Sequence, residues 1–180
     1  MASIIKDRAI VDDDFTVVRA AEDGTLPAVD ALPAGKIIVP FALWQASRDA
    51  LTAARGAAEI GVWLEPDSEP ADLVADFDKV ALIAIDFPVF RDGRGYSIAR
   101  LLRERYGYKG EIRAIGDVLY DQLRFYERCG FNAYALRADK DIHKALNAFT
   151  EFTVQYQGAF DDPNPLFRRR EAAAAQKATA

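Results

Sequence analysis

The chain has few of the residues on which redox and metal chemistry usually depend. Its 180 residues include one cysteine, Cys129, and one histidine, His143. A single thiol cannot form an internal disulfide, ligate an iron–sulfur cluster or run a dithiol cycle within one chain, and a lone histidine cannot build a His-rich metal site. No cofactor is evident from the sequence. We expect Cys129 to be a small apolar filler and His143 to have a surface or capping role.

The sequence also lacks a long apolar run. The longest one, Val80 to Phe90, contains Asp86 and is far shorter than the roughly 20 residues needed to cross a bilayer. The amino-terminal stretch MASIIKDRAIVDDD has neither the basic region nor the apolar core of a signal peptide. We therefore expect a cytoplasmic protein without a membrane partner.

Positive charge is in deficit. The chain has 23 Lys and Arg against 28 Asp and Glu, which gives a formal net charge of −5. Proteins that bind phosphate backbones carry dense positive charge, so no nucleic-acid partner is expected. The 51% hydrophobic and 28% charged residues are typical of a globular protein, and a chain of this length fits one domain.

From Lys36 onward, short β-rich runs alternate with longer helical patterns. The five expected strands are KIIVPF, IGVWLEP, KVALIAIDF, EIRAIG and FNAYALR, and a long helix is expected from about Asp141 to Tyr156. Continuous apolar runs suit strands that are covered on both faces. The predicted fold class is α/β, with a parallel sheet of about five strands built from successive βα units. A partial βα barrel, or half-barrel, is the alternative.

The two ends of the chain differ from this central pattern. Residues 1–160 are expected to form a single α/β domain, with a peripheral hairpin and loop over 1–35 and the βα repeats over 36–158. The hairpin is expected around the acidic run Asp12 to Asp14. Residues 159–180 are expected to be a carboxyl-terminal arm and a tail that is disordered after about Arg170. The segment FDDPNPLF either packs on its own domain, the interpretation we favour, or folds onto a neighbour in a homodimer.

Residues that follow the strands are the first candidates for function. Ligands of α/β proteins bind beyond the carboxyl ends of the strands. The expected positions there are Glu65, Asp86, Asp117, Arg137 and the loop from Arg91 to Ser97.

The loop RDGRGYS is the strongest local signal. Gly93 and Gly95 allow positive φ values, and Ser97 is placed to cap the following helix. Successive amides would then converge on a small oxyanion, with a charge-assisted contact from an arginine. Alternatively, the glycines only make a tight turn and the arginines pair with nearby aspartates. The anion-binding candidates are Arg91, Gly93, Arg94, Gly95, Tyr96, Ser97 and Arg137.

The same glycines do not make a dinucleotide-binding fingerprint. Gly93 and Gly95 match the first two positions of GxGxxG, but the third position is Ile98. The spacing of a Walker loop is absent as well. Neither nicotinamide nor ATP binding is predicted.

Acidic residues at the strand ends are candidates for chemistry. Glu65, Asp86 and Asp117 are candidates for a divalent-cation site, since hard cations take carboxylate oxygens from several elements. The interpretation that we favour is that they are solvated loop acids or helix caps, so no metal is predicted. The catalytic residues are unknown from the sequence, and the candidates are Asp86, Asp92 and Asp117.

The run from Phe87 to Arg137 carries a family resemblance. It contains FRDGRGYSxARLLR, then GDVLxDQL, then RCGF, in that order. These motifs resemble an uncharacterised bacterial family of small proteins encoded beside assimilatory sulfite reductase and labelled as oxidoreductases of sulfite reduction. The resemblance implies a role in sulfate assimilation and cysteine biosynthesis, with sulfite reductase or another enzyme of that pathway as partner.

Three functions are open at this point. The first is an accessory protein of sulfite reduction that docks on the reductase and presents an oxyanion through the RDGRGYS loop. The alternative is a stand-alone enzyme that acts on a small anionic metabolite, with Mg²⁺ or acid–base chemistry supplied by the strand-end acids. The third is a binding or scaffold domain whose glycine loop is purely structural. The sequence contains no redox-cofactor motif, so it leaves open whether the protein is an enzyme.

Overall fold

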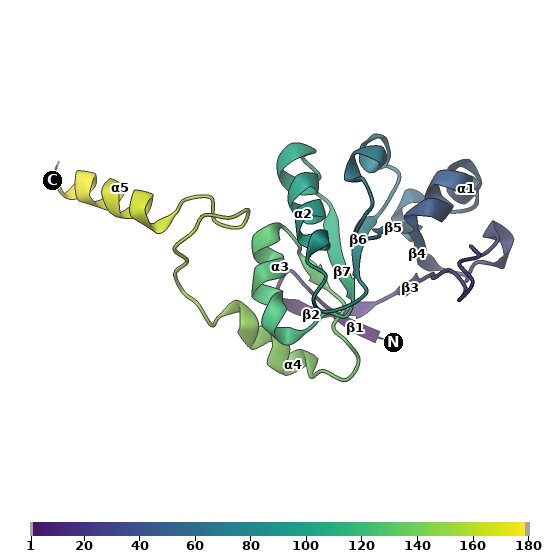
Figure 1. The fold of residues 1–180 in the computed structure, drawn as a ribbon, viewed down its shortest axis with the longest axis horizontal. Coiled ribbons are helices and arrows are strands. Elements are labelled where there is room, and N and C mark those ends of the chain that lie inside the picture. Colours follow the sequence, from purple (N-terminus) through teal and green to yellow (C-terminus); the bar gives the residue numbers. More distant parts are fainter. Residues whose placement is uncertain (1, 179–180) are drawn as a thin grey trace.

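The protein is built around one eight-stranded sheet with helices on its outer face (Figure 1). The computed structural model describes residues 2–178. The strand order is β2-β1-β8-β7-β6-β5-β4-β3. The strands are β1 (Ala2–Lys6), β2 (Ala9–Asp13), β3 (Phe15–Val17), β4 (Lys36–Pro40), β5 (Ile60–Leu64), β6 (Leu82–Phe87), β7 (Glu111–Gly116) and β8 (Ala133–Tyr134).

The prediction of a five-stranded parallel sheet is wrong in its strand number. All five predicted strands are present as β4 to β8, and β3 extends their parallel array. Strands β1 and β2 add an antiparallel pair at the other edge, next to β8. The three additional strands come from the amino-terminal residues, which bury Ile4, Ile5 and Val18 and so belong to the core.

The two edges of the sheet are joined by a single residue. Strand β2 ends at Asp13 and β3 begins at Phe15, although the two strands lie at opposite ends of the strand order. The chain can make this connection only if the sheet curls back on itself. From β7, Arg113 forms an ion pair with Asp13 at 2.8 Å, and its guanidinium carbon lies 5.3 Å from the centre of the Phe15 ring. The sheet is therefore nearly closed and barrel-like, which is closer to the half-barrel alternative.

The amino-terminal hairpin turns at a different place from the one expected. Strands β1 and β2 pair from Ala2 with Asp13 to Lys6 with Ala9. The two-residue turn between them is made by Asp7 and Arg8, whose φ values of 49° and 63° are typical of a tight hairpin turn. The acidic run at Asp12 to Asp14 instead marks the passage from one sheet edge to the other.

The two faces of the sheet have different contents. The outer face packs under the helices and contributes Ile37, Val62, Ile85 and other buried side chains to the main core. The inner face holds a smaller apolar cluster of Ile38, Trp63, Leu82, Ala84 and Ile115. The alternation of side chains along each strand produces this division.

Helices connect the strands on the outer face. The α-helices of the body are α1 (Phe41–Ala54), α2 (Arg94–Arg100), α3 (Leu123–Cys129) and α4 (Ile142–Ala145). Helix α2 continues as a π-helical turn over Leu101–Arg105, and α4 continues as a 3-10 helix over Leu146–Phe149. Further 3-10 helices are Val29–Ala31, Ala57–Glu59, Pro70–Asp76 and Tyr120–Gln122.

The long helix expected from Asp141 to Tyr156 is much shorter. Asp141 caps its start by accepting hydrogen bonds from the amides of His143 and Lys144, and the helical segment ends after Phe149. Phe149 is buried, whereas Phe152 and Tyr156 from the same predicted stripe are exposed. The second half of the stripe thus lacks the packing of an apolar face that supplies most of a helix's stability.

The chain after Phe149 forms an arm that extends from the body (Figure 1). It ends in helix α5 (Leu166–Ala178), which covers most of the segment for which no fixed structure was expected. Within residues 2–178, none of the helices combines the length and the apolar character needed to span a membrane.

Candidate functional site

A depression of about 550 Å³ opens at the carboxyl ends of the strands. The loops after β3, β6, β7 and β8 all reach it, which agrees with the general position of ligand sites in such folds. It is lined by two arginines, two aspartates and three other residues. These are Arg19, Asp86, Phe87, Pro88, Gly116, Asp117 and Arg137. We call it the strand-end depression.

Arg19 is held in place from two sides. Its Nη2 donates a hydrogen bond to Oδ1 of Asp86 at 2.8 Å, and its guanidinium carbon lies 4.9 Å from the centre of the Trp63 ring. Trp63 is fixed in turn by a hydrogen bond from its Nε1 to the carbonyl of Val18 at 2.9 Å. Cation–π contact and ion pairing thus orient the guanidinium group before any ligand arrives.

Gly116 makes room for the Asp86 carboxylate. It has a φ of +92°, and a Cβ at this position would lie 2.5 Å from the carbonyl oxygen of Phe87 and 2.8 Å from Oδ1 of Asp86. Both the backbone angle and the space therefore require glycine here. The amide of Asp117 then donates to the carbonyl of Phe87 at 2.7 Å, which fixes the start of the following loop.

Asp117 and Arg137 form the second pair of the depression. The Oδ1 atom of Asp117 accepts from Nη1 of Arg137 at 2.8 Å, and its Oδ2 accepts from the amide of Phe90 at 3.0 Å. Arg137 also binds both carboxylate oxygens of Asp139. Hydrogen bonds from Arg137, and then from Lys140, hold the pKa of Asp139 well below its usual range.

The residues that line the strand-end depression have no net charge, but their guanidinium N–H groups are accessible hydrogen-bond donors. Its two guanidinium groups are balanced by its two carboxylates, and the side chains of Arg19 and Arg137 remain 46% and 44% exposed. Within residues 2–178, Arg19 donates only the one hydrogen bond to Asp86, so its other N–H groups are available to a ligand. Such fixed and half-exposed guanidinium groups suit a small oxyanion.

The RDGRGYS loop does not have the backbone that was expected. Gly93 has a φ of −89° and Gly95 is helical, so neither takes a positive value. Asp92, rather than Ser97, satisfies the start of α2 by accepting from the amide of Arg94 at 3.2 Å. Asp92 also pairs with the Arg94 guanidinium at 2.7 Å, and the hydrogen bonds from Arg94 lower the pKa of Asp92.

The loop's other residues have mostly structural surroundings. A Cβ on Gly95 would lie 2.7 Å from Cζ of Phe87, so this glycine permits the close packing of α2 on β6. Tyr96 packs its ring against Phe87 and burial raises its pKa. Ser97 is exposed and lines a different depression along α2, while Arg91 is exposed and has no hydrogen-bond or ion-pair partner among the residues described.

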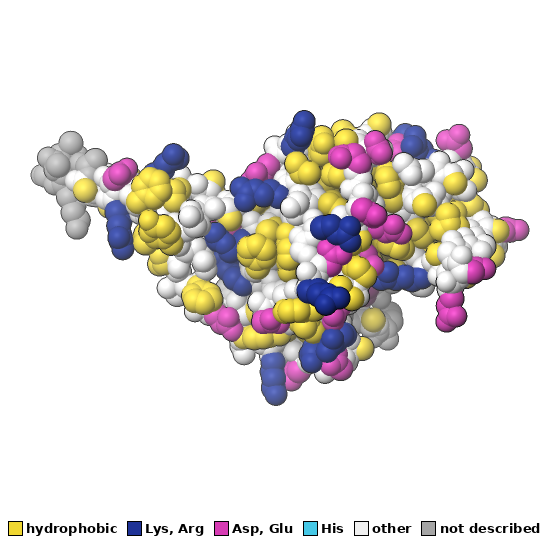
Figure 2. Space-filling view, in the orientation of Figure 1, with side chains coloured by type: hydrophobic (Ala, Val, Ile, Leu, Met, Phe, Trp, Pro, Cys, Tyr) yellow, Lys and Arg dark blue, Asp and Glu magenta, His cyan; other side chains and the backbone are white. Residues whose placement is uncertain are grey.

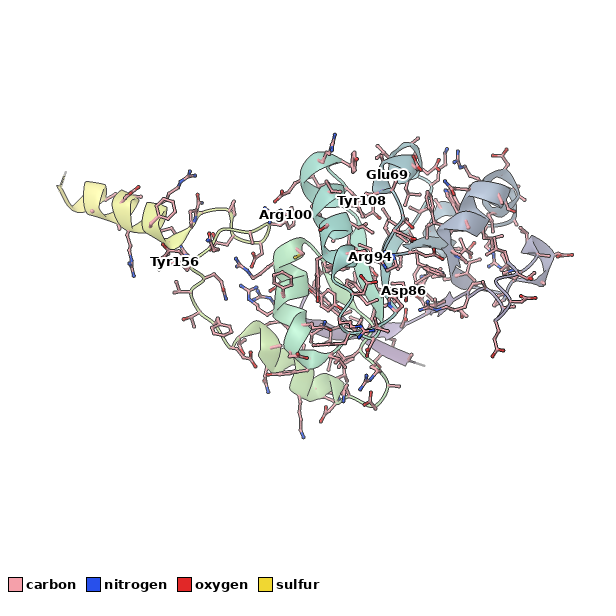
Figure 3. All side chains as sticks on the ribbon, viewed as in Figure 1. Glu69, Asp86, Arg94, Arg100, Tyr108 and Tyr156 are labelled. Atoms are coloured by element: carbon pink, nitrogen blue, oxygen red, sulfur yellow. The ribbon has the colours of Figure 1, made fainter. Side chains whose placement is uncertain are left out.

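Figure 3 places the labelled members of this region. Asp86 and Arg94 lie toward the same end of β6, whereas Arg100 lies farther along α2 and Tyr156 lies on the arm. Arg94 is nevertheless not part of the lining of the strand-end depression. The loop therefore borders the candidate site, while Arg19 and Arg137 line it.

The three acids considered for a metal site are not gathered in one place. Asp86 and Asp117 line the strand-end depression, but Glu65 lines another one with Asp67 and Glu69. Across residues 2–178, no group of three or more His, Cys, Asp or Glu side chains is arranged to hold a metal ion.

The single cysteine and the single histidine of the sequence, Cys129 and His143, do not belong to the strand-end depression. Cys129 is buried, and burial raises the pKa of its thiol to about 11, as suits an apolar filler. His143 is exposed in the first turn of α4. Neither lines the strand-end depression.

Sequence reasoning missed Arg19, which lines the depression, and Trp63, whose ring lies under the Arg19 guanidinium. Arg19 follows the strand Phe15–Val17, which pairs in parallel with β4. Because ligands of α/β proteins bind beyond the carboxyl ends of parallel strands, Arg19 would be a candidate once this strand is assigned to the sheet. Residues 1–35 were expected to form a peripheral hairpin and loop, so no ligand-binding strand end was predicted there. Trp63 lies inside a strand and carries no local signal for a role in binding.

Comparisons with known proteins yield a family and little else. Searches of curated proteins and of solved structures found no significant match. A family model described as "Bacterial protein of unknown function (DUF934)" matches residues 61–167, which include Asp86, Gly116, Asp117 and Arg137. Since the match covers more than half of the chain, this protein belongs to the DUF934 family of bacterial proteins.

Proposed function

We propose that this protein is an accessory protein of assimilatory sulfite reduction that binds a small oxyanion in the strand-end depression and docks on sulfite reductase. The assignment to sulfite reduction rests on the motifs between Phe87 and Arg137 and on the family that they resemble. The binding activity rests on the geometry of the depression. These two supports are independent of each other.

The observation that carries the proposal is the pair of fixed guanidinium groups. Arg19 and Arg137 line the same depression, and each is oriented by an aspartate at 2.8 Å. An ordered arginine loses less conformational freedom when it binds an anion than a free one does. Arg91 in the bordering loop is exposed, has no ion-pair partner among residues 2–178, and supplies additional positive charge.

Calorimetric titration with sulfite, and separately with sulfate, tests the binding. Arg19→Gln and Arg137→Gln should each weaken binding about tenfold or more, because each removes a charged hydrogen-bond donor. Arg105→Gln is the matched control, since Arg105 is exposed at the end of the π-helical turn that follows α2 and does not line the strand-end depression. Equal affinity in all three variants contradicts this site.

The partner is tested with purified sulfite reductase. The full chain should associate with the reductase in sedimentation experiments and change its rate of sulfite turnover. The Arg19→Gln variant should keep the association and lose the effect on turnover, which separates docking from oxyanion binding. Absence of both association and an effect on turnover contradicts the accessory role.

A stand-alone enzyme acting on a small anionic metabolite is the second candidate. It is favoured by the presence of both Asp86 and Asp117 in the strand-end depression. In this case Mg²⁺ should bind the wild-type protein and fail to bind Asp86→Asn in a calorimetric titration. Mg²⁺ binding that is unaffected by this substitution contradicts a role for the depression.

A further inference from the structure

The arm is held to the body by two neighbouring aspartates that bind in different directions. Asp161 forms ion pairs with Arg124 at 3.0 Å and with Arg128 at 3.4 Å, and both arginines belong to α3. Asp162 binds Arg169 in the first turn of α5 at 3.3 Å. One aspartate thus attaches the arm to the body, and the next one attaches α5 to the arm.

Helix α5 itself projects beyond this anchor (Figure 1). It has 13 residues, and isolated helices of about this length are marginally stable in water. Its Phe167 side chain is 47% exposed. An exposed phenylalanine on a short projecting helix is an anchor of the kind that helix-in-groove contacts use.

The charge of α5 is opposite to that of the rest of the chain. The helix has four basic side chains and one acidic one, so its net charge is +3. Because the whole chain has a formal net charge of −5, the remaining residues carry −8. Electrostatic attraction therefore favours binding of α5 to the body of this same protein.

A second exposed apolar group lies beside the strand-end depression. Val89 and Phe90 in the loop after β6 are 46% and 50% exposed, and Phe125 on α3 is 53% exposed. The loop and the helix are joined because Nε2 of Gln122, just before α3, donates to the carbonyl of Phe90 at 3.2 Å. We call Val89, Phe90 and Phe125 the rim patch.

The rim patch has an acidic neighbour. Asp121 is exposed, precedes Phe125 by four residues, and has no ion-pair partner among residues 2–178. Basic side chains flank Phe167 in α5 at Arg168 and Arg170. Figure 2 shows hydrophobic side chains on the surface of the arm and also over α2 and α3. The two surfaces are therefore alike in apolar character, and the Asp121 carboxylate offers a partner to the arginines of α5, although Arg91 next to Phe90 is basic.

We propose that α5 of one copy packs on the rim patch of a second copy, with Phe167 against Phe90 and Phe125 and the flanking arginines near Asp121. Helix α5 projects away from its own body, so the acceptor is another chain (Figure 1). Reciprocal exchange of two arms closes a symmetric dimer. This inference goes beyond the proposed function and does not depend on it.

Cysteine cross-linking between two differently sized chains tests the contact. In a Cys129→Ala background, one chain carries Phe167→Cys and the other carries Phe125→Cys, and the mixture is oxidised mildly. The mixed disulfide should form about tenfold faster than in a control mixture with Val74→Cys, because docking raises the effective concentration of the thiols. Val74 is also an exposed apolar residue, but it belongs to the 3-10 helix Pro70–Asp76.

Oligomeric state provides the second measurement. The wild-type protein should sediment as a dimer, and Phe167→Asp and Phe125→Asp should each sediment as monomers. A mixture of the two variants should regain dimer, because one arm–patch contact is intact in the mixed pair. A wild-type monomer at the highest soluble concentration, equal cross-linking at Val74, or a disulfide within one chain carrying both cysteines overturns the proposal.

Discussion

Two sets of arginine–carboxylate pairs, one within the sheet and one at the ends of its strands, have the same chemistry and different surroundings. Arg113 is 3% exposed and pairs with Asp13 and Glu111, which also binds Lys6. The strand-end pairs Arg19–Asp86 and Arg137–Asp117 have arginines that are nearly half exposed. The first set stabilises the closed sheet, because breaking a buried pair leaves an uncompensated charge. The exposed arginines of the second set remain accessible to ligands.

Removal of the buried arginine should have the largest effect. Arg113→Met leaves Asp13 and Glu111 without their buried partner, and we expect a loss of about 3–5 kcal/mol in the free energy of unfolding. Arg19→Met should lose less than this, because Arg19 is half exposed and the strand-end depression gives water access to the Asp86 carboxylate, which is itself only 10% exposed. Urea denaturation followed by circular dichroism measures both. Similar losses in the two variants contradict the contrast between the closing and the accessible pairs.

Alanine at Gly116 should damage the accessible end specifically. The new Cβ would approach the Phe87 carbonyl and the Asp86 carboxylate, so destabilisation should exceed by about 1–3 kcal/mol the cost of the backbone angle alone. Gly107→Ala is the matched control, since Gly107 has a φ of +69° and open space around it, and should cost about 1 kcal/mol. Denaturation and oxyanion titration of both variants check this. Equal effects would mean that Gly116 is needed only for its backbone angle.

The smallest expected effect concerns acid titration at the accessible end. The pKa of Asp139 is depressed in the folded protein, chiefly by Arg137, so the pair stabilises the fold above the ordinary aspartate range and stops doing so as the pH falls through the folded pKa. Arg137→Gln should raise the pKa of Asp139 toward its ordinary value in an NMR titration. Lys140→Gln should raise it less, because Lys140 contributes the second hydrogen bond. An unchanged pKa in Arg137→Gln contradicts the pairing.

The central strands were predictable because they are local and strongly apolar. The runs that became β4 to β8 are continuous β-rich segments between helical patterns, and each is present in the structure. The prediction failed where the partner of a segment is distant in sequence. Strand β3 is three residues long, and its identity depends on pairing with β4. The expected helix to Tyr156 failed for a related reason, since periodicity alone does not supply a surface to pack against.

The candidate site was found in part by the same kind of reasoning. Asp86, Asp117 and Arg137 follow strands that were predicted, and they line one depression. Arg19 follows a strand that was not assigned to the sheet, and Glu65 follows a predicted strand but lines another depression. The position of a residue along the chain identifies the end of a strand. The curvature of the sheet determines which strand ends share a depression.

The sequence by itself determined the α/β class, the five central strands, the absence of a dinucleotide fingerprint and the motifs that carry the family resemblance. These features depend on local composition, period and spacing. Only the tertiary structure decided that the sheet closes through Asp14, that Arg19 stacks on Trp63 beside Asp86, and that α5 projects from the body. Each of these depends on contacts between residues far apart in the chain, which no local pattern encodes.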